Sequence, residues 1–205
     1  NCIGLPFQVS VQVDPKPFVQ TINETVCSDS PFTISPANGN GNIVPAGTTY
    51  TWTFVDNPDV TGEATGTAAA NFTQTLSNTT TSPQTVTYTV TPTSGDSGNC
   101  QGDPFTINIT VNPNPLINAK ELLICSGDTF DFGLTDGLNG DRIPTGTKYT
   151  WVVLPNANIT GAVNQTVPQN SVVITEPLLN TSTSPQLITY QVTPTSATGC
   201  AGATF

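Results

Sequence analysis

The sequence predicts an all-β protein made of tandem two-sheet antiparallel β-sandwich repeats. Two observations predict it: closely similar stretches return about a hundred residues apart, and apolar and polar residues alternate within each stretch. The composition agrees, because charged residues make up only 9% of the 205 residues and β-branched residues recur between Pro and Gly breaks. Helix formers are scarce, so little helix is expected.

The repeat is marked by four landmarks that return at offsets of 98 to 102 residues. A unit of about one hundred residues is the size of one small sandwich domain. The landmarks are "TVCSDSPFTISP" (25–36) and "LICSGDTFDFGL" (123–134), "VPAGTTYTWTF" (44–54) and "IPTGTKYTWVV" (143–153), "NTTTSPQTVTYTVTPTSG" (78–95) and "NTSTSPQLITYQVTPTSA" (180–197), and "NCQGDPFTINITVNPNP" (99–115) with a forerunner at 1–17 and an echo at 199–205.

Two proline-rich linkers divide the chain into repeats. "DPKP" begins at Asp14 and "NPNP" begins at Asn112, and prolines there fix φ and remove backbone donors, which predicts short, stiff joints. We expect residues 1–14 to be the last strand of a preceding repeat, residues 15–112 to be a complete repeat, and residues 113–205 to be a repeat lacking its final strand. The chain then looks like a window on a longer array.

Alternation within each repeat predicts half-buried strands, with one face on a core and the other in water. Apolar residues occupy every second position in "FTINITV" (105–111) and in "TVTYTVT" (85–91). Turn clusters rich in Gly, Asn and Asp separate such stretches, which gives about seven short strands per repeat. The aromatic residues in phase with the inward faces are assigned to the core: Trp52, Trp151, Tyr88 and Tyr190.

The order of these motifs resembles a known family. "CSGDTF" (125–130), "PTGTKYTW" (144–151) and "TSPQLITYQVTPTS" (183–196), with "INITVNPNP" (107–115), look like the PKD-like, immunoglobulin-like repeats of Bacteroidota surface proteins. Such repeats occur in long arrays in very large adhesins, including gliding-motility adhesins exported by the type IX secretion system. The resemblance covers nearly the whole chain. It implies a secreted, cell-surface stalk or adhesin, and no catalytic residues carry over.

The repeats and the resemblance together predict a mechanical function. Each repeat buries its own small core, so an array grows by adding units. We therefore expect a structural stalk of a large extracellular adhesin or surface filament, which holds an adhesive tip away from the cell. The expected partners are neighbouring repeats of the same type in the same long chain, and the surface ligand would bind outside this segment.

Two alternatives for the function stay open. Residues 1–14 of one molecule could supply the missing final strand of the next, which would make a fibre by strand donation. The chain could also be a carbohydrate-binding module, a function that usually requires exposed aromatic residues. Trp52 and Trp151 are the candidates for that role, although their phase along the strand places them in the core.

The composition argues against several other classes. A net charge of −10, with only 4 Lys and Arg, is unsuited to nucleic acid and to anionic membranes. No apolar run approaches the ~20 residues of a membrane span, so no membrane insertion is expected. The chain has no His, its 14 carboxylates form no pair that recurs between the repeats, and no nucleophile elbow is present. The sequence therefore predicts a non-enzyme without cofactors.

One loop offers oxygen ligands of the kind that Ca²⁺ binds. "TDGLNGD" (135–141) contains Asp136, Asn139 and Asp141. The equivalent loop of the first repeat, "ANGNGN" (37–42), has no carboxylate, and Gly, Asn and Asp also favour turns because they tolerate positive φ. Turn formation is therefore the main interpretation, and these three residues are weak calcium candidates.

Five cysteines recur at fixed places in the repeat, and a surface location favours disulfides. Cys27 and Cys125 fall in the turn between the first two strands, whereas Cys100 and Cys200 fall in the turn before the last strand. In an immunoglobulin-like order these turns lie at opposite poles, and a seven-residue strand is ~23 Å long. A disulfide needs Cα atoms within ~7 Å, so a bridge within one repeat is disfavoured.

The sequence instead favours a Cys27–Cys200 disulfide across the junction between the repeats. The pole that carries Cys27 faces the next repeat, whose near pole carries Cys200. The within-repeat pairs Cys27–Cys100 and Cys125–Cys200 remain alternatives. With a bridge across the junction, Cys2, Cys100 and Cys125 would pair with neighbouring repeats outside this chain.

Overall fold

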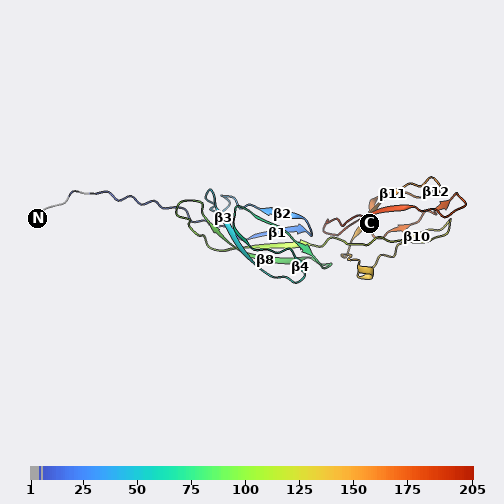
Figure 1. Cartoon of the computed structure of the whole chain (residues 1–205), viewed down its shortest axis with the longest axis horizontal. Helices are drawn as coiled ribbons and strands as arrows, with labels where there is room; N and C mark the ends of the chain where they lie inside the picture. The colour runs from blue at the N-terminus through green and yellow to red at the C-terminus, as the bar shows by residue number, and fades with distance from the viewer. Residues whose placement is uncertain (1–4, 6) are drawn as a thin grey trace.

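The computed structural model, which describes residue 5 and residues 7–205, consists of strands joined by turns and irregular loops. The one helical element among those residues is a single 3₁₀ turn, η1 (Leu138–Gly140), in an exposed loop. Two β-domains follow one another along the long axis, and an extended N-terminal segment leads into the first of them (Figure 1). The prediction of tandem all-β domains is confirmed.

The first domain contains nine strands, from β1 to β9. Turns separate them at the Gly-, Asn- and Asp-rich clusters of the sequence. The strands are β1 (Ile22–Cys27), β2 (Pro31–Ile34), β3 (Thr49–Val55), β4 (Val60–Thr61), β5 (Gly66–Ala69), β6 (Phe72–Thr75), β7 (Ser77–Asn78), β8 (Gln84–Thr93) and β9 (Phe105–Asn112).

Five of these strands form one sheet, in the order β1-β9-β8-β3-β5. β8 lies antiparallel to both β3 and β9. One pairing departs from the antiparallel pattern, because β1 runs parallel to β9, with Cys27 opposite Asn112 at its end. β1 and β9 come from opposite ends of the repeat, and alternation of side chains along a strand does not indicate the direction of its neighbour.

Two short strand pairs, β2–β6 and β4–β7, cover the inner face of this sheet. Phe72 of β6 connects the layers, since its ring centroid lies 4.9 Å from that of Trp52 and 4.7 Å from that of Tyr88. The predicted alternation is confirmed in the inner strand β9. Its inward side chains are all buried: Phe105, Ile107, Ile109 and Val111.

The second domain follows the same plan with seven strands among the described residues. β11 is paired with β13 on one side and β16 on the other, and the pairs β10–β14 and β12–β15 complete the domain. No strand follows β16 in the part of the chain that the structure describes. The strands are β10 (Phe130–Asp131), β11 (Lys148–Leu154), β12 (Ile159–Thr160), β13 (Gln165–Gln169), β14 (Val173–Ile174), β15 (Leu179–Asn180) and β16 (Thr189–Thr195).

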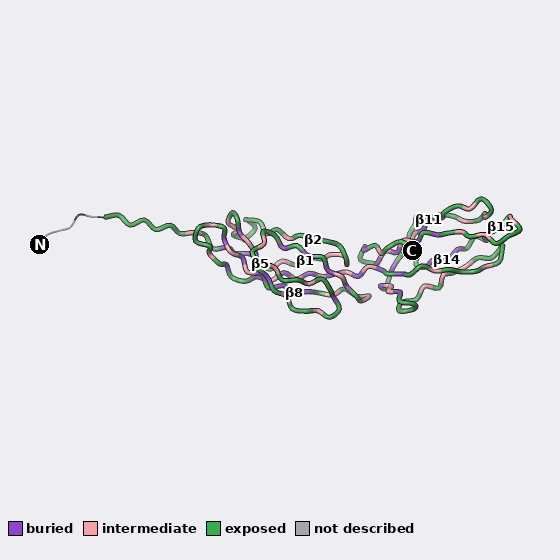
Figure 2. Tube along the Cα trace, viewed as in Figure 1, coloured by how far each residue is buried: buried purple, intermediate pink, exposed green. Residues whose placement is uncertain are grey.

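Each domain has its own core, as expected for a repeat array. Buried stretches run inside both domains, whereas the N-terminal segment is exposed along its described length (Figure 2). β9 ends at Asn112, and the backbone of Leu116 pairs with Arg142 of the second domain. Residues 113–115 therefore connect the domains. That the repeats divide between residues 112 and 113 stays a prediction.

The N-terminal segment differs from a strand in a sheet. The sequence predicts the last strand of a preceding repeat over residues 1–14, and residues 1–4 and 6 of that range lie outside the described part of the chain. Residues 7–14 are extended and pair with no strand. At the end of the segment, Asp14 contacts the first domain, since its Oδ2 accepts from the Gly98 N–H at 2.7 Å.

Candidate functional site: the joint between the domains

A disulfide between Cys27 and Cys200 joins the two domains, with the Cα atoms 5.5 Å apart. Cys27 is the last residue of β1 and lies beside Asn112 of β9, at the end of the first domain. Cys200 is buried in the turn that follows β16. This is the pair that the sequence favours. Because each sulfur forms one bridge, it leaves no place for Cys27–Cys100 or Cys125–Cys200.

Hydrogen bonds close the same joint around the linker. The Ser28 backbone N–H donates to the Asn112 carbonyl at 2.8 Å, and the Asn114 side-chain amide donates to the Ser28 carbonyl at 2.7 Å. Across the junction, the Arg142 guanidinium donates to the Thr79 carbonyl at 3.3 Å. The linker prolines are therefore flanked by covalent and polar contacts, and the joint does not depend on the linker alone.

Glycine lets each linker lie against the domain that follows it. A Cβ atom at Gly202 would collide with the carbonyl oxygen of Pro115, the last residue of the "NPNP" linker. Gly102 stands in the same relation to Pro17 of the "DPKP" linker. The chain thus has the same close approach of linker to turn at the start of each domain.

Two cysteines stay free in the described part of the chain, and they match the bridged ones. Cys100 occupies the place in the first domain that Cys200 occupies in the second, and Cys125 occupies the place of Cys27. Cys125 is exposed and Cys100 is partly buried. Cys2 lies outside the described residues. That these three pair with neighbouring repeats stays a prediction.

Both tryptophans are core residues. Trp52 and Trp151 are each 5% exposed, and their indole N–H groups donate to backbone carbonyls at 2.9 and 3.1 Å. Tyr88 and Tyr190 are also buried. A sugar ring stacks on an exposed aromatic face, so the carbohydrate-binding alternative loses its candidate residues.

The buried tyrosines are held by packing. The phenol oxygens of Tyr88 and Tyr190 have no hydrogen-bond partner among the described residues. Burial raises the pKa of the Tyr88 phenol well above its ordinary value, and the nearby Glu63 carboxylate adds to the effect. Burial likewise raises the pKa of Tyr190, with an addition from Glu176.

A buried asparagine explains why the "NTTTSP" motif returns. Asn78 folds its own turn, because its side-chain oxygen accepts from the Thr80 backbone N–H at 2.8 Å and its Nδ2 donates to the Ser82 carbonyl at 2.8 Å. The same Nδ2 donates to the Val111 carbonyl of β9, also at 2.8 Å. One side chain therefore connects this turn to β9, an inner strand of the sheet.

The second copy of the motif forms the same turn. The Asn180 side-chain oxygen accepts from the Ser182 backbone N–H at 2.9 Å, and Nδ2 donates to the Ser184 carbonyl at 2.8 Å. Asn180 is only partly buried, since no counterpart of β9 covers it in the described residues. The motif is thus a turn-forming element whose contact with a strand is made in one domain only.

A family model for the PKD-like domain matches the chain twice, over residues 24–115 and over residues 122–205. The chain belongs to this family. Compared with the curated proteins, the sequence has no match. Two PKD-like domains therefore stand in tandem, and the disulfide joins them.

The calcium candidates of the second PKD-like domain form hydrogen bonds within the protein. Asp141 is buried, its Oδ1 accepts from the Asn118 backbone N–H at 3.0 Å, and its Oδ2 lies 2.6 Å from the Lys120 ammonium. Its negative charge is therefore paired within the domain.

The other two candidates also contact the backbone. Asp136 accepts from the Ile143 N–H at 2.7 Å. Asn139 takes part through its carbonyl, which accepts from the Asn118 side-chain amide at 2.8 Å. These bonds close the loop that contains η1.

The first PKD-like domain builds the equivalent loop with neutral amides. Asn38 accepts from the Val44 N–H at 3.2 Å, and Asn42 accepts from the Gln20 N–H at 2.9 Å. Side-chain amide oxygens in the first domain thus accept the backbone hydrogen bonds that carboxylate oxygens accept in the second. These contacts support turn formation as the role of the loop residues.

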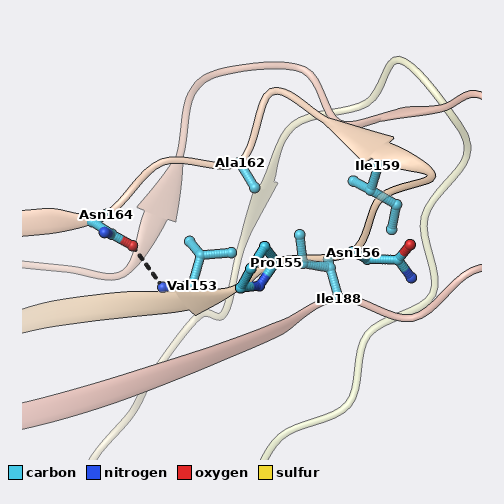
Figure 3. Close-up of a pocket in the computed structure, with 7 residues that line it drawn as sticks. All are labelled: Val153, Pro155, Asn156, Ile159, Ala162, Asn164 and Ile188. Carbon is cyan, nitrogen blue, oxygen red and sulfur yellow. Dashed lines mark hydrogen bonds between the residues drawn. The ribbon is translucent and has the colours of Figure 1, made fainter.

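A small pocket opens at the far end of the second PKD-like domain (Figure 3). Val153 stands there in the place of Phe54, whose ring centroid lies 6.0 Å from that of Tyr88 in the first domain. The smaller side chain leaves space, so we interpret the pocket as a packing difference. Its lining residues carry no charge: Val153, Pro155, Asn156, Ile159, Ala162, Asn164 and Ile188.

Two other kinds of site are missing from the residues that the structure describes. No group of three or more Cys, Asp or Glu side chains there is arranged to hold a metal ion. Within the same residues, no helix has the length and apolar character needed to cross a membrane.

Proposed function

We propose that the chain is a stalk segment of a large extracellular surface adhesin, which holds an adhesive tip away from the cell. The observation that carries the proposal is the Cys27–Cys200 disulfide across the joint. A linker alone lets two domains bend about it, whereas a bridge beside the linker gives the joint a second connection and removes most of that freedom. The end-to-end arrangement of the domains supports an extended rod (Figure 1).

Several features support a location outside the cell. Disulfides persist in oxidising environments, and PKD-like domains are typical of extracellular surface proteins. A net charge of −10 opposes self-association along the rod. The assignment to a gliding-motility adhesin of Bacteroidota, exported by the type IX secretion system, rests on the resemblance of the sequence motifs.

The proposed role is mechanical and not catalytic. Its partners are neighbouring PKD-like repeats of the same long chain, and the surface ligand would bind outside this segment. Each domain has a separate core, so adding a domain lengthens the rod without a new packing solution.

Small-angle X-ray scattering tests the stalk. We expect the oxidised protein to give an elongated particle with a narrow distance distribution. The Cys27→Ser/Cys200→Ser variant should keep both domain folds, checked by tryptophan fluorescence, and give a broader distribution. Cys125→Ser is the matched control, because it removes an exposed free thiol and should change nothing. A compact particle for the oxidised protein, or no broadening in the double variant, would contradict the proposal.

A further inference from the structure

The joint between the domains has a third attachment besides the linker and the disulfide. The Arg142 guanidinium donates to the Thr79 carbonyl at 3.3 Å across the junction, and its Nε atom is buried without a hydrogen-bond partner among the described residues. The head of this side chain is therefore partly removed from water at the joint. We propose that Arg142 is a positioning residue, which fixes the rotation of the second domain relative to the first.

The other two attachments lie side by side. Cys27 is the register partner of Asn112, where the linker begins. At the other end of the linker, a Cβ atom at Gly202 would lie 2.1 Å from the Pro115 carbonyl oxygen, so the turn that carries Cys200 touches the linker as well. Two bodies joined at two neighbouring points can still rock about the line through those points. Fixing their rotation requires a third contact away from that line.

The contact between Arg142 and Thr79 is made by a different part of the first domain. Cys27 ends β1, at the edge of the five-stranded sheet. Thr79 follows β7, which pairs with β4 in the layer that covers this sheet. The disulfide thus attaches the second domain to the sheet, whereas Arg142 attaches it to the covering layer. Rocking that the linker and the disulfide permit would separate Arg142 from Thr79.

The donor is held in place by its own domain. The backbone of Arg142 exchanges two hydrogen bonds with that of Leu116, at 2.7 and 2.8 Å, directly after the linker. The neighbouring Asp141 accepts from the Asn118 N–H at 3.0 Å and pairs with the Lys120 ammonium at 2.6 Å. The loop therefore presents the guanidinium from a fixed backbone.

The acceptor is also held in place by its own domain. The Thr79 backbone N–H donates to the Asp59 carbonyl at 2.9 Å, and the Thr79 hydroxyl donates to the same oxygen at 3.0 Å. The preceding Asn78 closes the turn, because its side-chain oxygen accepts from the Thr80 N–H at 2.8 Å. A carbonyl fixed in this way loses little conformational freedom when it accepts a bond from the second domain.

Comparison of the two repeats supplies the substitution that tests the contact. Ile43 occupies the place of Arg142 in the first domain. Each of the two pairs through its backbone with the residue that follows the preceding linker. The backbone geometry is therefore shared and only the side chain differs. Arg142→Ile should remove the contact across the junction and keep the fold of the second domain.

Residual dipolar couplings of the backbone N–H groups test the proposal on the oxidised 205-residue chain, since they report the orientation and motion of each domain separately. We expect one alignment tensor to fit both domains of the unsubstituted chain. Arg142→Ile should require two tensors of different magnitude, because its domains rock. Chemical shifts within each domain check that both folds are kept. Lys148→Ala removes the same charge from a side chain that donates to Asn170 of its own domain, and it should keep one tensor.

The inference rests on the proposed stalk function, because a fixed rotation between domains matters in a rod, yet the two can fail separately. A single tensor of unchanged orientation in Arg142→Ile overturns the role of Arg142, and so does an equal effect of Lys148→Ala. The stalk proposal survives either result, since it rests on the disulfide. Two tensors of different magnitude in the unsubstituted chain contradict both.

The equilibrium of the disulfide gives a second readout. A contact that orients the domains also brings Cys27 and Cys200 together, so the two are thermodynamically linked. Equilibration with reduced and oxidised glutathione measures the effective concentration of one thiol beside the other. With the other three cysteines replaced by serine, Arg142→Ile should lower this effective concentration by roughly threefold to tenfold, since it removes one charge-assisted hydrogen bond from a partly exposed donor. An unchanged effective concentration overturns the inference.

Discussion

The two PKD-like domains share one sequence plan and, among the described residues, differ by two strands, the counterparts of β1 and β9. In the first domain, β9 lies between β1 and β8, and its inward side chains are buried. In the second, no strand lies outside β16 in the described residues, and residues 120–125 form no counterpart of β1. β8 spans 10 residues and β16 spans 7. Strand formation here depends on a hydrogen-bonded neighbour, since unpaired backbone groups remain with water.

The two domains also differ in how fully their core residues are buried. Val86 and Tyr88 are fully buried in the first domain, whereas Ile188 is half-buried and Tyr190 keeps 8% of its surface exposed in the second. β9 thus both pairs with its neighbours and covers the apolar residues beside them. We expect the first domain to be the more stable, because it buries more apolar surface.

Removing a central side chain of β9 should reverse that order. Ile107 is fully buried, so Ile107→Ala should lower the free energy of unfolding of the first domain by about 2–5 kcal/mol. Urea unfolding can be followed for each domain separately, because each contains one tryptophan. Trp52 reports on the first domain in a Trp151→Phe background, and Trp151 on the second in a Trp52→Phe background.

The neighbouring residue on the other face is the control for this substitution. Thr106→Ala should change the free energy of unfolding by less than about 1 kcal/mol, since Thr106 is not fully buried. An equal loss in Ile107→Ala and Thr106→Ala would mean that β9 acts through its backbone pairing alone.

The two motif asparagines should differ in the cost of their removal. Asn78→Ala breaks a buried contact with β9 as well as the turn, and we expect a loss of about 2–4 kcal/mol. Asn180→Ala breaks the turn alone and should cost about 1–2 kcal/mol. Urea midpoints of the two domains measure the difference. Equal costs would show that the turn, and not the contact with β9, determines stability.

Much of the fold could be predicted because its signals are local and repeated. The alternation in "FTINITV" and "TVTYTVT" indicates which side chains point inward, and the tandem landmarks indicate two domains. The joint disulfide followed from the placement of Cys27 and Cys200 in turns at opposite poles. These inferences need the period of a strand, the immunoglobulin-like strand order and the reach of a disulfide.

Other features could not be predicted, for physical reasons. The parallel pairing of β1 with β9 connects segments far apart in the sequence, and no local pattern gives their direction. Two-residue strands such as β4 and β7 are too short to show any alternation. Residues 120–125 form no strand, and alternation along a segment does not indicate whether a partner strand lies beside it.

A smaller effect on the free energy of unfolding is expected in the loop at residues 135–141, where a carboxylate replaces the amide acceptor of the first domain. Asp141→Asn gives the second domain the amide that Asn42 supplies in the first, and it keeps the bond from the Asn118 N–H. Only the ion pair with Lys120 is lost, and the Lys120 side chain is 17% exposed and can reach water, so we expect a cost of about 1–2 kcal/mol. Thermal unfolding with and without millimolar Ca²⁺ supplies the control. A Ca²⁺-dependent rise in melting temperature that Asp141→Asn abolishes would favour a cation site.

The smallest effect at neutral pH concerns the core tyrosines. The Tyr88 phenol oxygen is buried without a hydrogen-bond partner among the described residues, so Tyr88→Phe should change the free energy of unfolding by less than about 1 kcal/mol. Tyr190→Phe should behave alike, since its oxygen is also unpartnered there. The two substitutions are then expected to differ in their effect on stability only at alkaline pH.

Burial raises the pKa of Tyr88 above the ordinary value of 10.0, whereas the unfolded chain releases this proton near that value. The stability that the neutral phenol contributes is therefore complete below pH 10.0 and is lost as the pH rises toward the folded pKa. Tyr88→Phe should flatten the decline of stability of the first domain between about pH 10 and 12. Tyr190→Phe should have a smaller effect on the decline of stability of the second domain, because Tyr190 is less buried than Tyr88. Urea midpoints across this range measure both, and an unchanged profile in Tyr88→Phe would assign the alkaline loss to Tyr50, whose pKa burial also raises.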